Sequence, residues 1–189
     1  HCAAKLRVAL KDQLLLFTFR TKSEGGKVAL AHEEYLHFIR TVLATDCADL
    51  IDIEFFTAGA ELPALIEEAH TAGAAVVCSS HDFHKTPPRA ELVSRMVAMQ
   101  RAGADLPKLA VMPQSRTDVL ELLAATAEMA DRHPETPIIT MSMGALGAVS
   151  RLSGEALGSA MTFANPGQAS APGQVSLEVV NEVLDALHL

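Results

Sequence analysis

The chain has 189 residues, of which 49% are apolar and 20% are charged, so it is long enough for one domain with a sizeable core. Its formal net charge of −8 argues against a nucleic-acid-binding surface, although a pocket can still be locally positive and bind an anion. No apolar stretch approaches the roughly 18 residues of a membrane span, and no signal-peptide pattern opens the sequence.

Short apolar runs alternate with segments of helical spacing along the whole chain. After each run, apolar residues recur three and four positions apart, as in Leu36, Ile39 and Leu43, which predicts a helix. The six runs predicted to be strands are residues 14–20, 50–55, 74–80, 106–113, 138–143 and 160–163.

This alternation predicts an α/β domain with a parallel sheet. A doubly wound sheet usually carries a glycine-rich phosphate-binding turn, and the sequence has neither G-x-G-x-x-G nor a P-loop. A (β/α)8 TIM barrel instead collects polar residues at the carboxyl ends of its strands. Four polar residues and one methionine lie at or just beyond the predicted strand ends: Arg20, Glu24, His81, Arg151 and Met143. We therefore predict a barrel.

A complete barrel of this kind has eight strands and about 250 residues, so six of the eight βα units are expected here. The sequence begins at His1 rather than at a methionine, and residues 3–10 resemble the end of a helix. We predict a single barrel domain over residues 1–189 that lacks its first two βα units. A chain that is truly this short would be a fragment, inactive or active only with a complementing piece.

Lys108 lies in the middle of the apolar run 106–113. Strand alternation places it on one face with Ala110 and Met112. If both faces of the strand are buried, desolvation lowers the pKa of the Lys108 ammonium, and a neutral amine is a nucleophile toward carbonyl groups. If the strand is an edge strand, Lys108 simply points to solvent. The run alone does not separate these interpretations.

Other polar residues near the strand ends also have two interpretations. His81 is either a general acid/base or a structural hydrogen-bonding residue, and with His84 it has the spacing of a metal pair, although no third ligand is evident. Asp52 and Glu54 share one strand face. They are either paired acids for proton transfer or, as we favour, the partners of a buried arginine or lysine.

Seven segments hold most of these polar residues: FTFRTKSEGG, LIDIEF, SSHDFHKTP, LPKLAVMPQS, PIITMSMG, SRLSGE and SAPGQ. In this order and approximate spacing they resemble the type I 3-dehydroquinate dehydratases, from about Leu14 to the C-terminus. The resemblance implies a (β/α)8 barrel, usually a homodimer, that dehydrates 3-dehydroquinate to 3-dehydroshikimate in the shikimate pathway of aromatic amino acid biosynthesis. It implies no metal and no organic cofactor.

The resemblance also implies catalytic roles for three residues. Lys108 matches the lysine that forms a Schiff base with the substrate ketone, and His81 matches the general acid/base. Glu24 matches the glutamate that orients this histidine and tunes its proton affinity. The chemistry of these residue types is suitable, because a protonated imine is an electron sink and one histidine can remove a proton and then donate it to the departing hydroxyl.

Substrate binding is implied for six further residues. The family also uses an acidic residue and an arginine from the second barrel strand, which this chain lacks. The matching residues present here are Arg20 for substrate hydroxyls, Arg151 for the substrate carboxylate, Met141 and Met143 for the pocket wall, and Ser170 and Gln174 for a loop that closes over the pocket.

Two alternatives remain open from the sequence. One is a truncated, catalytically inactive barrel that serves as an interaction or vestigial module. The other is a class I aldolase or a related lysine-imine barrel, which shares the amine but not the Arg20–Glu24 and Ser170–Gln174 motifs. The expected partner is a small-molecule substrate, with no nucleic acid or membrane. Because Cys2, Cys47 and Cys78 lack metal-like spacing, reduced thiols in the cytoplasm are the simplest interpretation.

Overall fold

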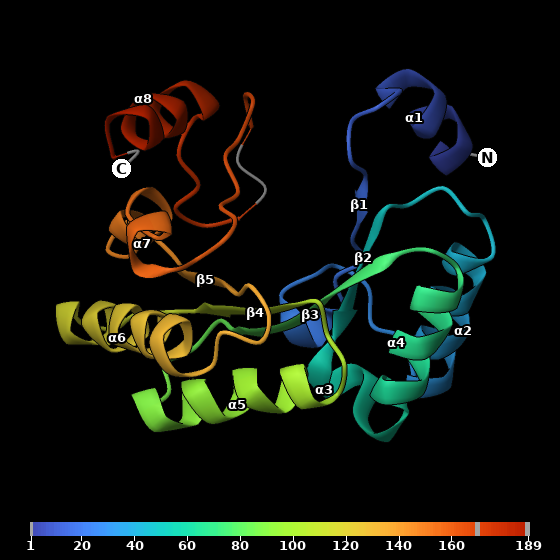
Figure 1. The fold of residues 1–189 in the computed structure, drawn as a ribbon, viewed down its shortest axis with the longest axis horizontal. Coiled ribbons are helices and arrows are strands. Elements are labelled where there is room, and N and C mark those ends of the chain that lie inside the picture. The colour runs from blue at the N-terminus through green and yellow to red at the C-terminus, as the bar shows by residue number, and fades with distance from the viewer. Residues whose placement is uncertain (1, 169–170, 188–189) are drawn as a thin grey trace. The chain divides into compact units, whose positions relative to one another are not determined.

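The computed structural model describes residues 2–168 and 171–187, with side chains described from residue 5 onward within these ranges. The chain divides into two units. The first consists of residues His1–Ser80 with Met99–Leu106, and the second of His81–Ala98 with Pro107–Leu189. In both units strands and helices alternate along the chain, as the sequence pattern predicts (Figure 1).

Parallel strands form the centre of the first unit. They are β1 (Leu16–Phe17), β2 (Leu50–Glu54) and most of β3 (Ala75–Asp82). β2 pairs with β3 along its whole length. β1 is shorter than the predicted run 14–20, because only its two residues pair with β2 before the chain leaves the ladder for a 3-10 turn at Lys22–Glu24.

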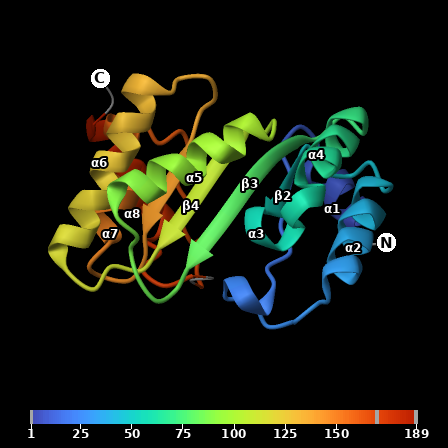
Figure 2. The same ribbon diagram turned by 90° about the horizontal axis from the view of Figure 1, so that it is seen from below.

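The helices of the first unit are α1 (Cys2–Leu10), α2 (His32–Leu43), the short α3 (Phe55–Ala58) and α4 (Leu62–Thr71). Of these, α2 and α4 each bury an apolar side. α2 and α4 lie side by side in both views (Figures 1 and 2). Their buried residues follow the helical spacing read from the sequence: Tyr35, Leu36 and Ile39 on α2, and Leu62, Leu65, Ile66 and Ala69 on α4.

The second unit continues the same alternation. β4 and β5 are parallel, and Lys108 pairs with Ile139 while Ala110 pairs with Met141. α7 packs against both β5 and α8. The elements along this part of the chain are α5 (Arg89–Arg101, of which the last turn belongs to the first unit), β4 (Leu106–Val111), α6 (Arg116–Arg132), β5 (Ile139–Ser142), α7 (Ala148–Leu152) and α8 (Leu177–Leu187).

α6 begins after an N-cap at Ser115. Ser115 has extended backbone angles and its hydroxyl accepts a hydrogen bond from the Asp118 amide at 3.2 Å, while the Asp118 carboxylate accepts one from the Ser115 amide. This capping box satisfies amides that have no partner inside the helix. Even this 17-residue helix is too short and polar for a bilayer, and none of the helices in the described ranges could span a membrane.

The predicted sixth strand, residues 160–163, is not a strand. Its neighbourhood forms one isolated parallel bridge, between Ile138 and Ser159, and one backbone hydrogen bond, from the Ala160 amide to the Ile138 carbonyl at 2.8 Å. The segment has no continuous ladder, so the predicted strand is wrong. Phe163 nevertheless lies where it can contact a residue of β4, as described below.

Candidate active site

In the first unit, Arg20 is surrounded by acidic side chains from two strands and a turn. Its Nη2 donates a hydrogen bond to Asp52 at 2.7 Å, and its Nη1 donates to Glu54 at 3.1 Å and to the Ser79 hydroxyl at 2.8 Å. Glu24 forms an ion pair with the same Nη1 at 3.5 Å. Asp52 and Glu54 are fully buried, so the preferred interpretation of these two acids, as partners of a buried cation, is confirmed for Arg20.

The charges of this cluster act on the Arg20 guanidinium in opposite directions. Burial lowers the pKa of Arg20, but the charge and hydrogen bond of Asp52, followed by the charges of Glu54 and Glu24, outweigh burial and raise that pKa above its ordinary value. Arg20 therefore stays a cation whose orientation is fixed by three carboxylates. The sequence predicted an arginine or lysine as the partner of Asp52 and Glu54, but it did not predict the contacts with Glu24 and Ser79.

Glu24 lies in a tight turn that begins at Thr21. The Thr21 carbonyl accepts hydrogen bonds from the amides of Glu24 at 3.1 Å and Gly26 at 2.7 Å. A side chain at Gly26 would collide with the backbone of Arg20, since a Cβ there would lie 1.8 Å from the Arg20 carbonyl oxygen. Gly26 is thus required by a close approach of the backbone to itself. The turn keeps Glu24 buried, at 5% exposure.

In the second unit, Lys108 is buried at 6% exposure, which excludes the interpretation that it points to solvent from an edge strand. Its ammonium nitrogen lies 4.6 Å from the centre of the Phe163 ring. The face of an aromatic ring attracts a cation by about 0.5–2 kcal/mol, so this contact can stabilise either a lysine ammonium or a protonated imine at the same nitrogen. The sequence analysis placed Phe163 in a predicted strand and gave it no role in the site. The signal available for such a role was an aromatic residue at the end of an apolar run.

Met141 of β5 lies on the same side of the ladder as Lys108, and Met143 follows directly after the strand. Parallel register pairs Lys108 with Ile139 and Ala110 with Met141, and paired residues in a ladder project to the same face. Met141 and Met143 are both buried, at 5% and 2% exposure. The face shared by Lys108 and Ala110, which strand alternation predicts, is therefore extended by Met141.

Arg151 is buried at 2% exposure, and within residues 2–168 and 171–187 no ion pair joins it to an acidic side chain. Its Nη1 lies 3.5 Å from the Met141 sulfur and its Nη2 donates to the Pro172 carbonyl at 3.2 Å, while its Nε is buried without a hydrogen-bond partner in the described part of the chain. Burial alone lowers the pKa of Arg151. A buried guanidinium with unused donors and no carboxylate beside it is suited to bind an anionic ligand.

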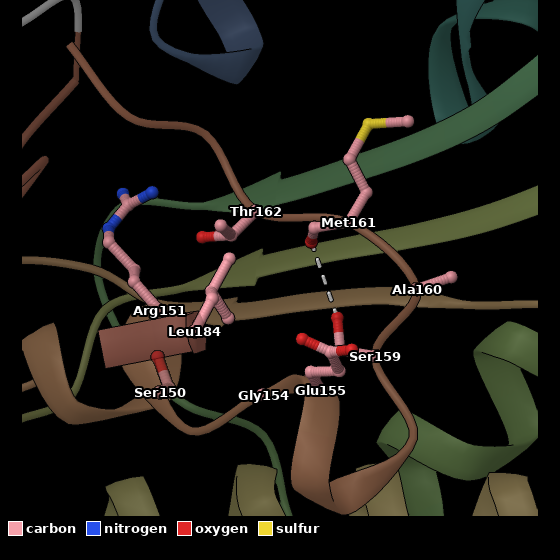
Figure 3. A pocket seen from close by; sticks show the side chains of 9 residues that line it. All are labelled: Ser150, Arg151, Gly154, Glu155, Ser159, Ala160, Met161, Thr162 and Leu184. Atoms are coloured by element: carbon pink, nitrogen blue, oxygen red, sulfur yellow. Dashed lines mark hydrogen bonds between the residues drawn. The ribbon is translucent and has the colours of Figure 1, made fainter. Parts of the chain in front are cut away.

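A pocket of about 190 Å³ adjoins the stem of Arg151 (Figure 3). In the close-up, the guanidinium end of Arg151 points away from Ser159, whose hydroxyl bonds to the Met161 carbonyl. Of the predicted substrate-binding residues within the described ranges, Arg151 is the one that lines it. The full lining consists of Ser150, Arg151, Gly154, Glu155, Ser159, Ala160, Met161, Thr162 and Leu184.

The remaining predicted site residues also belong to the second unit. His81, at the end of β3, is partly exposed and its ring stacks at 22° on Phe83 with centroids 6.5 Å apart. The Gln174 side-chain oxygen accepts a hydrogen bond from the Ala171 amide at 3.3 Å. Ser170 lies outside the described residues. Within residues 2–168 and 171–187, no three His, Cys, Asp or Glu side chains are arranged to hold a metal.

A family model described as type I 3-dehydroquinase matches residues 1–189. The 3-dehydroquinate dehydratase of Klebsiella pneumoniae subsp. pneumoniae is 52% identical over 184 residues, which are 97% of this chain and 73% of that protein. The 3-dehydroquinate dehydratase of Salmonella typhimurium is 48% identical over 188 residues, which cover all of this chain and 75% of the relative.

Solved structures give the same result. The type I 3-dehydroquinate dehydratase of Clostridium difficile, solved with covalently modified comenic acid, has a TM-score of 0.93 at 46% identity over 98% of this chain and 73% of that one. The Geobacillus kaustophilus 3-dehydroquinate dehydratase has a TM-score of 0.93 at 40% identity, covering 98% and 72%. The carboxyl transferase domain of Rhizobium etli pyruvate carboxylase, at 13% identity and a TM-score of 0.69, shares the fold alone.

Proposed function

We propose a mechanism from the premise that this chain belongs to the type I 3-dehydroquinase family and dehydrates 3-dehydroquinate to 3-dehydroshikimate in the shikimate pathway. Membership confirms the predicted TIM-barrel class and favours the enzyme over an inactive module or an aldolase. The roles of individual residues, set out below, are proposals.

Lys108 forms the Schiff base. Its neutral amine attacks the substrate ketone carbon, water leaves, and a protonated imine forms at Nζ. The imine withdraws electrons from the neighbouring carbon, so a proton on that carbon can be removed to give an enamine. The enamine then expels the hydroxyl group with a proton as water, and hydrolysis of the new imine returns Lys108. The observation that carries this role is the burial of Lys108 at 6% exposure, with Nζ over the Phe163 ring.

His81 moves the proton. A histidine has an ordinary pKa near neutrality, so it can accept the proton from the carbon and then protonate the departing hydroxyl. Glu24 orients this imidazole and tunes its proton affinity, as the family resemblance implies. Its burial at 5% exposure supports such a role, because a carboxylate acts more strongly on its neighbours when little water screens it. No metal or organic cofactor is needed, since the imine supplies the electron sink.

Two arginines bind the substrate in different ways. Arg151 binds the substrate carboxylate, which is supported by its unused Nε and the absence of an acidic partner beside it in the described ranges. Arg20 binds substrate hydroxyls while it stays paired with the carboxylates of Asp52 and Glu54. Met141 and Met143 line the pocket near the imine, while Ser170 and Gln174 belong to a loop that closes over it.

Borohydride reduction tests whether Lys108 forms the Schiff base. In the presence of 3-dehydroquinate, borohydride should reduce the imine and attach the substrate skeleton to Lys108, which peptide mass spectrometry detects. Lys108→Ala should lose both labelling and turnover, whereas Lys5→Ala, at an exposed helix position, should keep both. His81→Ala should still be labelled at Lys108 but should turn over slowly. Labelling at another lysine would contradict the proposal.

The protein acts in the cytoplasm as a homodimer. Free thiols support a reducing compartment, because Cys47 and Cys78 are both unpaired with another cysteine. The dimer rests on the family resemblance. Light scattering during size-exclusion chromatography should give twice the chain mass of 20.1 kDa. A mass equal to one chain at micromolar concentration would contradict the dimer.

A further inference from the structure

Glu54 is a fully buried carboxylate that accepts four hydrogen bonds. Its Oε1 accepts from the Thr21 amide at 2.8 Å and from Arg20 Nη1 at 3.1 Å. Its Oε2 accepts from the hydroxyls of Thr21 at 2.7 Å and Thr57 at 2.6 Å. All four donors lie on the first unit, and two of them belong to the residue that opens the Glu24 turn. Such a saturated carboxylate holds its partners in one geometry.

The acceptors of the two Arg20 Nη1 hydrogens determine whether the guanidinium forms a hydrogen bond with Glu24. Each terminal guanidinium nitrogen carries two hydrogens, and the two nearest acceptors of Nη1 are the Ser79 hydroxyl at 2.8 Å and Glu54 at 3.1 Å. Glu24 lies farther from the same nitrogen, at 3.5 Å, in an ion pair without a hydrogen bond between them. The charge of Arg20 is thus close to Glu24, yet its donors point to other acceptors.

We propose that Glu54 is a positioning residue of the dehydratase: it takes the Nη1 hydrogen that Glu24 would otherwise receive, and it fixes the Thr21 turn from which Glu24 projects. Glu24 is thereby held in place without being captured by Arg20. This inference rests on the proposed function in one respect, the assignment to Glu24 of orienting the imidazole that transfers the proton. It adds a residue that does not touch the substrate and acts through Glu24 and through Arg20, which is proposed to bind substrate hydroxyls.

A structural ion pair alone would be arranged differently. Three carboxylates (Glu24, Asp52 and Glu54) surround one guanidinium, and burying more negative than positive charge is costly. Asp52 alone would be enough to pair with Arg20, since it makes the shortest contact at 2.7 Å. The additional buried acid is explained if its purpose is to divide the guanidinium donors among several acceptors.

Glu54→Gln tests the proposal with little change in shape. The amide keeps one oxygen for the Thr21 amide and Arg20, and its NH2 can donate to the two threonine hydroxyls after these rotate. It is a weaker acceptor than a carboxylate, so Nη1 should turn toward Glu24. The expected result is a fall in kcat/KM per folded chain of about 10- to 100-fold, as small misplacements of reacting groups produce.

The pH profile separates positioning from a purely structural role. The charged or titratable groups facing Glu54 are Arg20, which it contacts, Glu24 and Asp52, which share that guanidinium, and Tyr35, whose phenol oxygen accepts from the Glu54 amide at 2.8 Å. Glu54→Gln removes the Glu54 charge and strengthens the Arg20–Glu24 pair. Both changes reduce the negative charge acting on a neighbouring titrating group, so that group binds its proton less tightly. The acid limb of the kcat profile should therefore move to lower pH, by about 0.5 unit. A loss of folded protein would lower the profile without moving it.

A second variant and two controls keep the test decisive. Ser79→Ala also frees an Nη1 hydrogen and should reproduce the shift, and it decides the matter if Glu54→Gln does not fold. Glu68→Gln is the matched control, because Glu68 forms an exposed ion pair with Arg40. Thr71→Val is the control for hydroxyl loss, since that hydroxyl only bonds the Glu67 carbonyl in its own helix. Both controls should stay within about twofold of the unmodified protein, as exposed pairs contribute little.

The outcomes are separable from those of the proposed function. If Glu54→Gln and Ser79→Ala keep kcat/KM and the acid limb of the controls, the positioning role is overturned. If both variants lower kcat/KM and shift the limb, it is supported. Rates are normalised to the folded fraction from circular dichroism, so a loss of folded protein does not imitate the effect. Borohydride labelling of Lys108 in the unmodified protein is a separate experiment, and it decides the Schiff base independently of the Glu54 result.

Discussion

Two arginines with little solvent exposure show how the same side chain is used in two ways within one chain. Arg20, with 16% of its side chain exposed, is paired with carboxylates of Glu24, Asp52 and Glu54. Arg151, at 2% exposure, has a thioether and a backbone carbonyl as its partners. Burial lowers the pKa of both guanidinium groups, but at Arg20 the carboxylates outweigh it and raise the pKa, whereas nothing offsets it at Arg151.

The difference indicates what each arginine is for. The charge of Arg20 is balanced by the protein itself, so the folded state depends on that arginine. The charge of Arg151 is not balanced by an ion pair within the described residues, and under the proposed role a bound anion would offset its desolvation cost. Substitutions at the two positions should therefore separate stability from substrate affinity.

The largest effect is expected for Arg20→Met. Removing the cation leaves buried carboxylates without their partner, which should lower the free energy of unfolding by about 3–5 kcal/mol. Urea denaturation followed by circular dichroism measures this loss. Arg40→Met is the matched control, because it breaks an arginine–glutamate pair whose side chains are 43% and 41% exposed and should cost about 0.3–0.5 kcal/mol. Equal losses for the two variants would remove the distinction between the arginines.

Arg151→Met should weaken substrate binding without lowering the stability of the fold. The free energy of unfolding should be unchanged or higher, since a desolvated charge is replaced by an apolar chain of similar length. The KM for 3-dehydroquinate should rise about 30- to 150-fold, equivalent to about 2–3 kcal/mol for a charged hydrogen-bonding contact. Steady-state kinetics and denaturation of the same preparation provide the comparison. Arg132→Met, which affects an exposed pair with Glu128, should leave KM unaltered.

A smaller effect is expected for Phe163→Leu. Leucine keeps an apolar contact with Lys108 but lacks the ring face 4.6 Å from Nζ, so the protonated imine should lose about 1 kcal/mol of stabilisation. The rate of borohydride labelling at saturating substrate should fall about fivefold. Phe56→Leu, at an aromatic position with 60% exposure, is the control. An unchanged labelling rate would mean that the ring only fills space.

The smallest effect concerns an exposed carboxylate, for contrast with the buried ones. The pKa of Asp118 is lowered, first by the hydrogen bond from the Gln114 amide and then by the Ser115 hydroxyl. The stabilisation this provides is present above the ordinary pKa near 3.8 and is lost as pH falls through the lowered folded pKa. Asp118→Asn should therefore be slightly less stable than the unmodified protein at pH 6, and melting temperatures should converge below about pH 3. A difference that persists at low pH would contradict this origin.

The sequence predicted some features of the candidate site and left others open. Asp52 and Glu54 were assigned to one strand face as partners of a buried cation, because alternation in a strand fixes which residues share a face. That cation was named only as an arginine or lysine, since the residue that meets this face comes from a separate strand and turn. The burial of Lys108 was left open by its own run, because burial depends on what covers the strand.

The amino-acid sequence by itself determined the order of strands and helices, the caps and turns that bound them, and the motifs that mark the family, since each depends on neighbours a few residues apart. The tertiary structure decided that residues 160–163 form no strand ladder, that Phe163 faces Lys108, and that Glu54 and Ser79 accept hydrogen bonds from Arg20. These contacts join residues that are tens of positions apart, so they are fixed by packing and by the pairing of buried polar groups, which local patterns do not encode.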